Sequence, residues 1–183
     1  MTFRSSRRSR VLRALIAVAV AAVSVIALSA AAPAARPAYA ATLVQCQGTE
    51  TVTYSPGVVL TPRNVTLTVR GRFSSCLDST GQVASGAYDE EFTIFVGCND
   101  LLDPFQGERI IKWNTGDSSV IDGAGSSTAV GGQVVTTFSG PVVQGRFQGR
   151  HAVETITLVQ TELLQCLTTG LTRATGLTTL TIV

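Results

Sequence analysis

The chain has 183 residues, of which 45% are hydrophobic and 14% are charged, and its formal net charge at pH 7 is +2. Six of the 14 basic residues lie in the first 40 positions and all 12 acidic residues follow them, so the remaining 183 − 40 = 143 residues carry a formal charge of 8 − 12 = −4. This acidic remainder excludes nucleic-acid or membrane-surface binding that rests on an overall basic balance.

The first 40 residues have the features of an export signal. Arginines between positions 4 and 13 precede an apolar run at 14–32, and Ala38-Tyr39-Ala40 forms a small-x-small cleavage signature. We therefore predict a signal peptide at 1–40, cleavage before Ala41, and a single secreted, extracellular domain at 41–183. General secretory export is favoured over the twin-arginine route, whose motif prefers Phe and Leu at positions 10 and 11. An uncleaved membrane anchor is the alternative.

After the export signal, abundant Thr, Val and Gly and the lack of a 3.6-residue apolar period predict an all-β domain. In 65–75, Val65, Leu67, Val69 and Phe73 alternate with polar residues, which predicts a long strand with one dry face. The other expected strands are 42–47, 50–54, 82–88, 91–96, 108–113, 118–121, 127–138 with a bend at Gly131-Gly132, 142–147, 150–160 and 177–183. Turns are expected at 55–57, 78–81, 114–117, 122–125 and 139–141.

Nine or ten short strands joined by turns are typical of a two-layer or closed all-β fold. We predict an antiparallel β-sandwich, immunoglobulin-like in the broad sense, with a small β-barrel as the alternative.

All four cysteines, Cys46, Cys76, Cys98 and Cys166, follow the export signal. An even number of cysteines in an exported domain predicts two disulfides. Three pairings are possible, and we favour Cys46–Cys76 with Cys98–Cys166, because sequential pairing is simplest between neighbouring strands. A zinc site is not predicted, because no pair has the spacing of a zinc knuckle.

The alanine-rich leader, the four spaced cysteines and the segments WNTGDSS (113–119) and GRFQG (145–149) resemble small exported all-β proteins of actinobacteria whose function is unassigned. The resemblance covers most of the chain after the leader. It implies an extracellular β-domain and assigns no activity, cofactor or site residue.

Catalytic groups are sparse. His151 is the only histidine, and no Gly-x-Ser-x-Gly motif is present, which argues against a Ser-His-Asp triad. Asp89, Glu90 and Glu91 form the densest acidic cluster, and a hydrolase could use two such carboxylates across a cleft. Their place between two expected strands instead predicts a solvated hairpin turn. We therefore expect no catalytic residue, no metal site and no cofactor.

The segment 98–106 is an expected loop with apolar residues beside a disulfide. Leu101, Leu102 and Phe105 follow Cys98, and a loop stiffened in this way loses little entropy when it binds a partner. We therefore predict a monomeric, non-catalytic binding module that recognises an extracellular protein or a glycan through these three residues. The alternatives are an inhibitor of an extracellular hydrolase that uses the same loop, a small hydrolase that uses the acidic cluster, and a loop that only covers the end of the domain.

Overall fold

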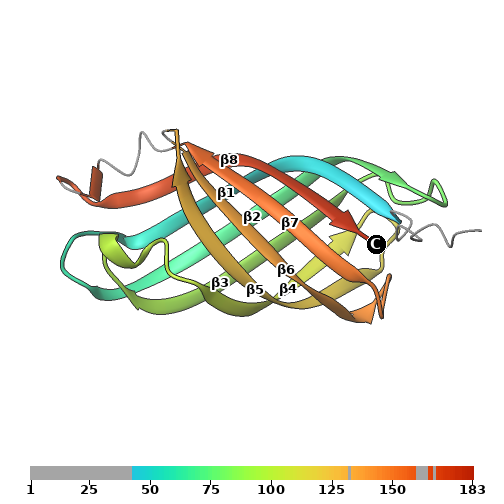
Figure 1. The fold of residues 1–183 in the computed structure, drawn as a ribbon, viewed down its shortest axis with the longest axis horizontal. Coiled ribbons are helices and arrows are strands. Elements are labelled where there is room, and N and C mark those ends of the chain that lie inside the picture. Colours follow the sequence, from blue (N-terminus) through green and yellow to red (C-terminus); the bar gives the residue numbers. More distant parts are fainter. Residues whose placement is uncertain (1–42, 132, 160–164, 167) are drawn as a thin grey trace, which may run out of the picture. The chain divides into compact units, whose positions relative to one another are not determined.

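The computed structural model describes residues 43–131, 133–159, 165–166 and 168–183 (Figure 1). The export signal predicted at 1–40 lies outside the described residues. The described residues form eight strands and a short 3-10 helix, η1 (Cys98–Asp100). The strands are β1 (Val44–Val58), β2 (Arg63–Asp78), β3 (Gly86–Val96), β4 (Phe105–Trp113), β5 (Ser118–Val130), β6 (Gln133–Gly145), β7 (His151–Val159) and β8 (Leu171–Ile182).

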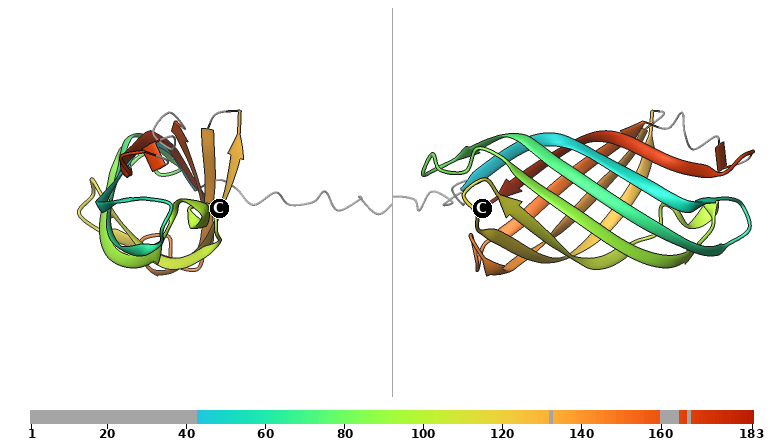
Figure 2. Two further views of the ribbon diagram at one scale, coloured as in Figure 1. Left: turned by 90° about the vertical axis from the view of Figure 1, so that its left-hand side faces the viewer. Right: turned by 180° about the vertical axis from the view of Figure 1, so that it is seen from behind.

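The eight strands form one closed antiparallel barrel. Each strand pairs with the next one along the chain, and β8 pairs with β1 to close the ring, which is seen end-on in Figure 2 (left). The all-β prediction is confirmed, and of the two predicted architectures the structure has the barrel, so the sandwich prediction is wrong. Alternation along single strands could not separate the two, because both architectures turn every second side chain inward.

The alternation predicted in 65–75 is present in β2, where Val65, Leu67, Val69 and Phe73 are buried. Other boundaries differ from the prediction. The turns expected at 122–125 and 139–141 lie inside β5 and β6. The segment 127–138 is not one bent strand, because the chain reverses after Val130, which pairs with Gln133. Small residues in these segments fit a continuous strand as well as a turn.

The two ends of the barrel differ. The loops after β2, β4 and β6 lie with the C-terminus at one end, which we call the closed end, and the loops after β1, β3 and β5 lie at the opposite, open end (Figure 1). Large buried side chains, including Phe73, Ile111 and Trp113, fill the lumen toward the closed end. The Trp113 ring meets the Phe147 ring edge-on, with 5.8 Å between centroids. This half of the barrel is a packed core.

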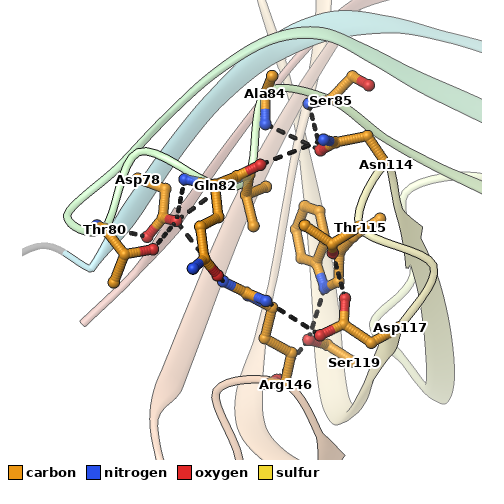
Figure 3. A network of polar contacts seen from close by, with 12 residues as sticks. Asp78, Thr80, Gln82, Ala84, Ser85, Asn114, Thr115, Asp117, Ser119 and Arg146 are labelled. Atoms are coloured by element: carbon orange, nitrogen blue, oxygen red, sulfur yellow. Dashed lines mark hydrogen bonds and ion pairs between the residues drawn. The ribbon is translucent and has the colours of Figure 1, made fainter.

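A polar network joins the loops of the closed end (Figure 3). Asp78 accepts hydrogen bonds from the backbone N–H groups of Thr80 and Gln82. Arg146 donates to Asp117 and to the Gln82 side chain, each over 3.0 Å. Burial would raise the pKa of Asp78, but hydrogen bonds from Thr80 and the loop backbone outweigh it and lower the pKa to about 2. The network connects all three loops and keeps this end shut.

Two disulfides confirm the favoured pairing. Cys46–Cys76 joins β1 to β2, and Cys98–Cys166 joins η1 to the segment that precedes β8 at the open end. Disulfides of this kind are typical of an oxidising compartment. Within the described residues, no helix is long and apolar enough to span a membrane.

Gly71 makes room for an aromatic ring from the neighbouring strand. It pairs with Glu50 on β1 and with Tyr88 on β3, and a Cβ atom built on it would lie 1.9 Å from the Tyr88 ring. The missing side chain therefore lets Glu50 and Tyr88 approach each other across the bare backbone of β2.

We expect Gly71→Ala to lower the free energy of unfolding by about 1–3 kcal/mol, because the added methyl group must displace the Tyr88 ring. Gly107→Ala is the matched control, since no atom lies within 4 Å of a Cβ at that position. Its effect should stay within about 0.5 kcal/mol. Urea denaturation measures both variants, and equal stability of the two would show that the ring does not depend on Gly71.

Candidate functional site

The open half of the lumen is a cavity instead of a packed core. Its volume is about 830 Å³, and side chains from all eight strands and from 100–104 line it. Val134, Ile156 and Ala174 are buried on this lining but do not belong to the core cluster. Small-molecule pockets have volumes of about 300–1,000 Å³, so the cavity has the size of a ligand site.

The wall of the barrel is open between β3 and β4. Among the described residues, two pairs join these strands, both at their closed-end termini. Phe92 and Ile94 share the inward side of β3 with Tyr88, yet 43% and 38% of their surface is exposed. Apolar side chains that point into a barrel are normally covered by their neighbours. Their exposure means that solvent reaches the cavity through this gap.

Leu101, Leu102 and Phe105, the residues predicted to form a binding loop, all line the cavity. Leu101 is partly buried against the core, while Leu102 and Phe105 are exposed at the opening. Phe105 begins β4 and stacks on Phe138 of β6, with 6.2 Å between centroids and 7° between ring planes. The apolar loop residues therefore form part of the entrance.

Charged and hydroxyl side chains from five strands converge inside the barrel between the packed core and the cavity, and we call them the lumen cluster. Its members are Glu50 (β1), Tyr88 and Glu90 (β3), Arg109 (β4), Glu154 (β7) and Thr178 (β8). Glu50, Glu90 and Arg109 line the cavity, and every member of the cluster except Glu90 is buried. The cluster forms the polar floor of a mostly apolar pocket.

Arg109 holds the cluster together. Its Nε and Nη2 atoms donate to Glu90 over 3.0 and 3.3 Å, and Nη1 donates to Glu154 over 2.5 Å. The guanidinium lies 4.0 Å from the centroid of the Tyr88 ring and 5.2 Å from that of Phe138. Burial opposes the charge, but the acidic neighbours, Glu154 foremost, outweigh burial and raise the pKa of Arg109. This cation is thus already matched by protein groups.

The contacts of Tyr88 require an additional proton. Its hydroxyl oxygen lies 2.5 Å from Oε2 of Glu50 and 2.8 Å from Oε1 of Glu154, but a tyrosine hydroxyl carries one hydrogen. Glu154 also accepts from Thr178 over 2.7 Å and from Arg109. We therefore assign the second proton to Glu50. While Glu50 is neutral, its carboxyl group donates to Tyr88, which in turn donates to Glu154; once Glu50 is ionised, Tyr88 donates to Oε2 of Glu50 instead.

Electrostatics agree with this proton assignment. Burial raises the pKa of Glu50 from its ordinary value of 4.5 to about 7, because Arg109 and the Tyr88 hydrogen bond only partly offset desolvation, and Glu154 and Glu90 add repulsion. Burial, followed by the charge of Glu154, also raises the pKa of Tyr88. The cavity floor therefore contains a carboxyl group that changes charge near neutral pH.

The acidic cluster at 89–91 was predicted as a solvated turn, and that prediction is wrong, because all three residues lie inside β3. Alternation turns Glu90 toward Arg109. Asp89 is on the outer side, where it meets Arg70 at 3.4 Å and Arg72 at 3.0 Å. Glu91 accepts a hydrogen bond from Thr68, also at the surface. All three border the cavity, but only Glu90 belongs to the lumen cluster. His151, at the start of β7, is exposed.

Glu50, Arg109 and Glu154 were not among the residues predicted for the site. A signal for them exists in the sequence, because each occupies the apolar side of an alternating strand. Glu154, for example, lies two residues from both Ala152 and Ile156, which are buried. A charged residue at such a position must find partners inside the protein. The partners themselves come from strands distant in sequence.

No group of three or more His, Cys, Asp or Glu side chains in the described part of the chain is arranged to hold a metal ion. No protein-family model, curated protein or solved structure matches the chain.

We expect Glu50→Gln to stabilise the protein at about pH 8 by up to about 3 kcal/mol and to have little effect at about pH 4. Glu50 ionises near pH 4.5 in the unfolded chain and near pH 7 in the folded one, so the unfolded state binds fewer protons between these values. Stability contributed at this position is therefore lost as the pH rises through that window, and glutamine removes the loss.

Urea denaturation at both pH values measures this difference, with Glu91→Gln on the outer side of β3 as the control. A Glu50→Gln protein that is less stable than the parent at about pH 8 would show that Glu50 is ionised and favourably paired.

Proposed function

We propose that the chain is a secreted binding protein that holds a small, largely apolar molecule in the open half of its barrel. The observation that carries the proposal is a cavity of about 830 Å³ whose inward-facing apolar side chains are open to solvent. A ligand that covers exposed apolar surface in a concave site is stabilised by about 25 cal/mol for each Å² removed from water.

The division of the lumen supports a binding role. A packed core and the polar network hold the closed end, so the scaffold does not depend on filling the open half. The Cys98–Cys166 disulfide ties η1, beside the entrance, to the segment before β8. A rigid entrance lowers the entropy lost on binding. The two disulfides, together with the resemblance to exported actinobacterial proteins, favour a place outside the cell.

The proposed ligand is a small molecule, whereas the sequence predicted recognition of an extracellular protein or a glycan. Leu101, Leu102 and Phe105 keep a role, because they border the entrance. Recognition of an extracellular protein or glycan would need these side chains to project from the surface. Their place on the cavity lining favours a ligand that enters the barrel.

The second candidate is a carboxylate-dependent hydrolase, and one observation favours it. Glu50 and Glu90 both face the cavity beside Arg109, and the pKa of Glu50 is raised to about 7, as a general acid requires. Glu90, however, accepts hydrogen bonds from Arg109 at both of its carboxylate oxygens, so neither oxygen is free to take a proton from a water molecule or substrate. Binding without turnover therefore explains the site better.

Binding can be measured with N-phenyl-1-naphthylamine, a neutral apolar dye that fluoresces when it leaves water. We expect the folded protein to enhance its fluorescence saturably. Ala174→Phe should weaken dye binding at least about tenfold, because the new ring would project into the cavity. Thr175→Phe, one residue along β8 and exposed, is the matched control and should bind like the parent.

Thermal denaturation of both variants separates a filled cavity from a misfolded barrel. No dye enhancement by the parent protein, or equal binding by a folded Ala174→Phe protein, would contradict the proposal. Turnover of a chromogenic ester or glycoside that disappears in Glu50→Gln would favour the hydrolase instead.

A further inference from the structure

The charges around the cavity are strongly one-sided. Among the described residues that line it, seven are acidic and one, Arg109, is basic. Asp89 is matched at the surface by Arg70 and Arg72, but the lining also includes Asp103 and Glu108 near the entrance. An acidic pocket with low-dielectric walls raises the local concentration of cations and repels anions.

Arg109 is not free to receive an anionic ligand. Its three guanidinium nitrogens already bind Glu90 and Glu154, and Tyr88 lies against one face of the group. An incoming carboxylate or sulfate would have to displace one of these acidic partners. The displaced carboxylate would then remain in a largely buried position without its cation, which is costly.

The uncharged part of the lining has the chemistry that organic cations favour. Phe92, Phe95, Phe105 and Phe138 all contribute to it, and aromatic faces attract alkylammonium groups by about 0.5–2 kcal/mol. Aliphatic side chains, among them Val134, Ile156 and Leu102, line other parts of the pocket. The site therefore combines carboxylates, aromatic rings and an apolar volume.

We infer that the cavity binds an amphiphilic organic cation, with its ammonium group beside Glu50 and Glu90 and its apolar part toward the entrance. This inference rests on the proposed function and specifies the class of ligand. With Glu50 neutral, the formal charge of Glu50, Glu90, Glu154 and Arg109 together is −1, and loss of the Glu50 proton makes it −2. Binding of the cation therefore favours release of this proton.

The groups that face Glu50 make the coupling specific. Arg109 on β4 favours its ionised form, whereas Glu90 on β3 and Glu154 on β7 favour the neutral form, and Tyr88 is its hydrogen-bond partner. A bound cation adds a second positive charge to this set. Affinity for the cation should thus increase as the pH rises through about 7, while affinity for a neutral ligand should not.

Isothermal titration calorimetry with three amphiphiles of one chain length tests the inference. Decyltrimethylammonium and decyl sulfate keep their charges at every pH used, and decanol is neutral. At about pH 8 we expect the cation to bind at least about tenfold more tightly than decyl sulfate. At about pH 5.5 the affinity for the cation should fall several-fold, with proton release detectable by comparing buffers of different ionisation enthalpy.

Glu50→Gln keeps the shape and hydrogen bonding of the neutral carboxyl group, so it should bind the cation equally at both pH values, with the low-pH affinity of the parent. Asp122→Asn removes one negative charge from an exposed position on β5 that is not part of the cavity lining, so it should keep the pH dependence. Circular dichroism of each variant verifies the fold.

The outcomes are distinct. Equal or tighter binding of decyl sulfate, with decanol also bound, would overturn the cation inference and leave the proposed function standing. A pH-independent affinity of the parent for decyltrimethylammonium would overturn the role of Glu50. Binding of none of the three amphiphiles would overturn the proposed function and the inference together.

Discussion

Burial of Arg109 among the carboxyl groups of Glu50, Glu90 and Glu154 is the constraint on which the rest of the barrel depends. Removing such charges from water costs several kcal/mol per ion, and the cost is recovered only if every group is matched. The partners come from β1, β3, β4 and β7, so the cluster exists only when the barrel has closed in its present register. The cluster is therefore compatible with this strand register alone, because a slip of one residue in any of these strands would turn a charge outward.

The cluster also divides the lumen into two parts with different physical roles. On one side, aromatic and aliphatic side chains fill the barrel, and the polar network of the closed end joins the loops. On the other side the space is open, and β3 and β4 separate after their first two pairs. An eight-stranded barrel is just wide enough either to be filled by its own side chains or to hold one small ligand. In this chain the closed half of the barrel is filled by side chains, and the open half contains the cavity that we propose as a ligand site.

Proton placement connects the fold to the proposed function. Tyr88 lies between Glu50 and Glu154 because Gly71 has no side chain to keep the strands' inward groups apart. Its one hydrogen cannot serve both carboxylates, so the floor of the cavity holds one further proton, which the proposed cation would displace. A structural feature of β2, the absence of one methyl group, thus influences the charge at the floor of the proposed ligand site.

Local pattern alone determined the all-β class and the dry face of β2, because alternation is a property of short stretches. Residue order favoured one of three cysteine pairings, and the structure has that one. Local pattern did not separate barrel from sandwich, and it placed Asp89, Glu90 and Glu91 in a turn, because a run of three acidic residues is ordinarily exposed. The lumen cluster, the cavity and the gap between β3 and β4 were decided by tertiary structure. They depend on which strands become neighbours and in which register, and these long-range pairings leave no periodic trace in the sequence of any one strand.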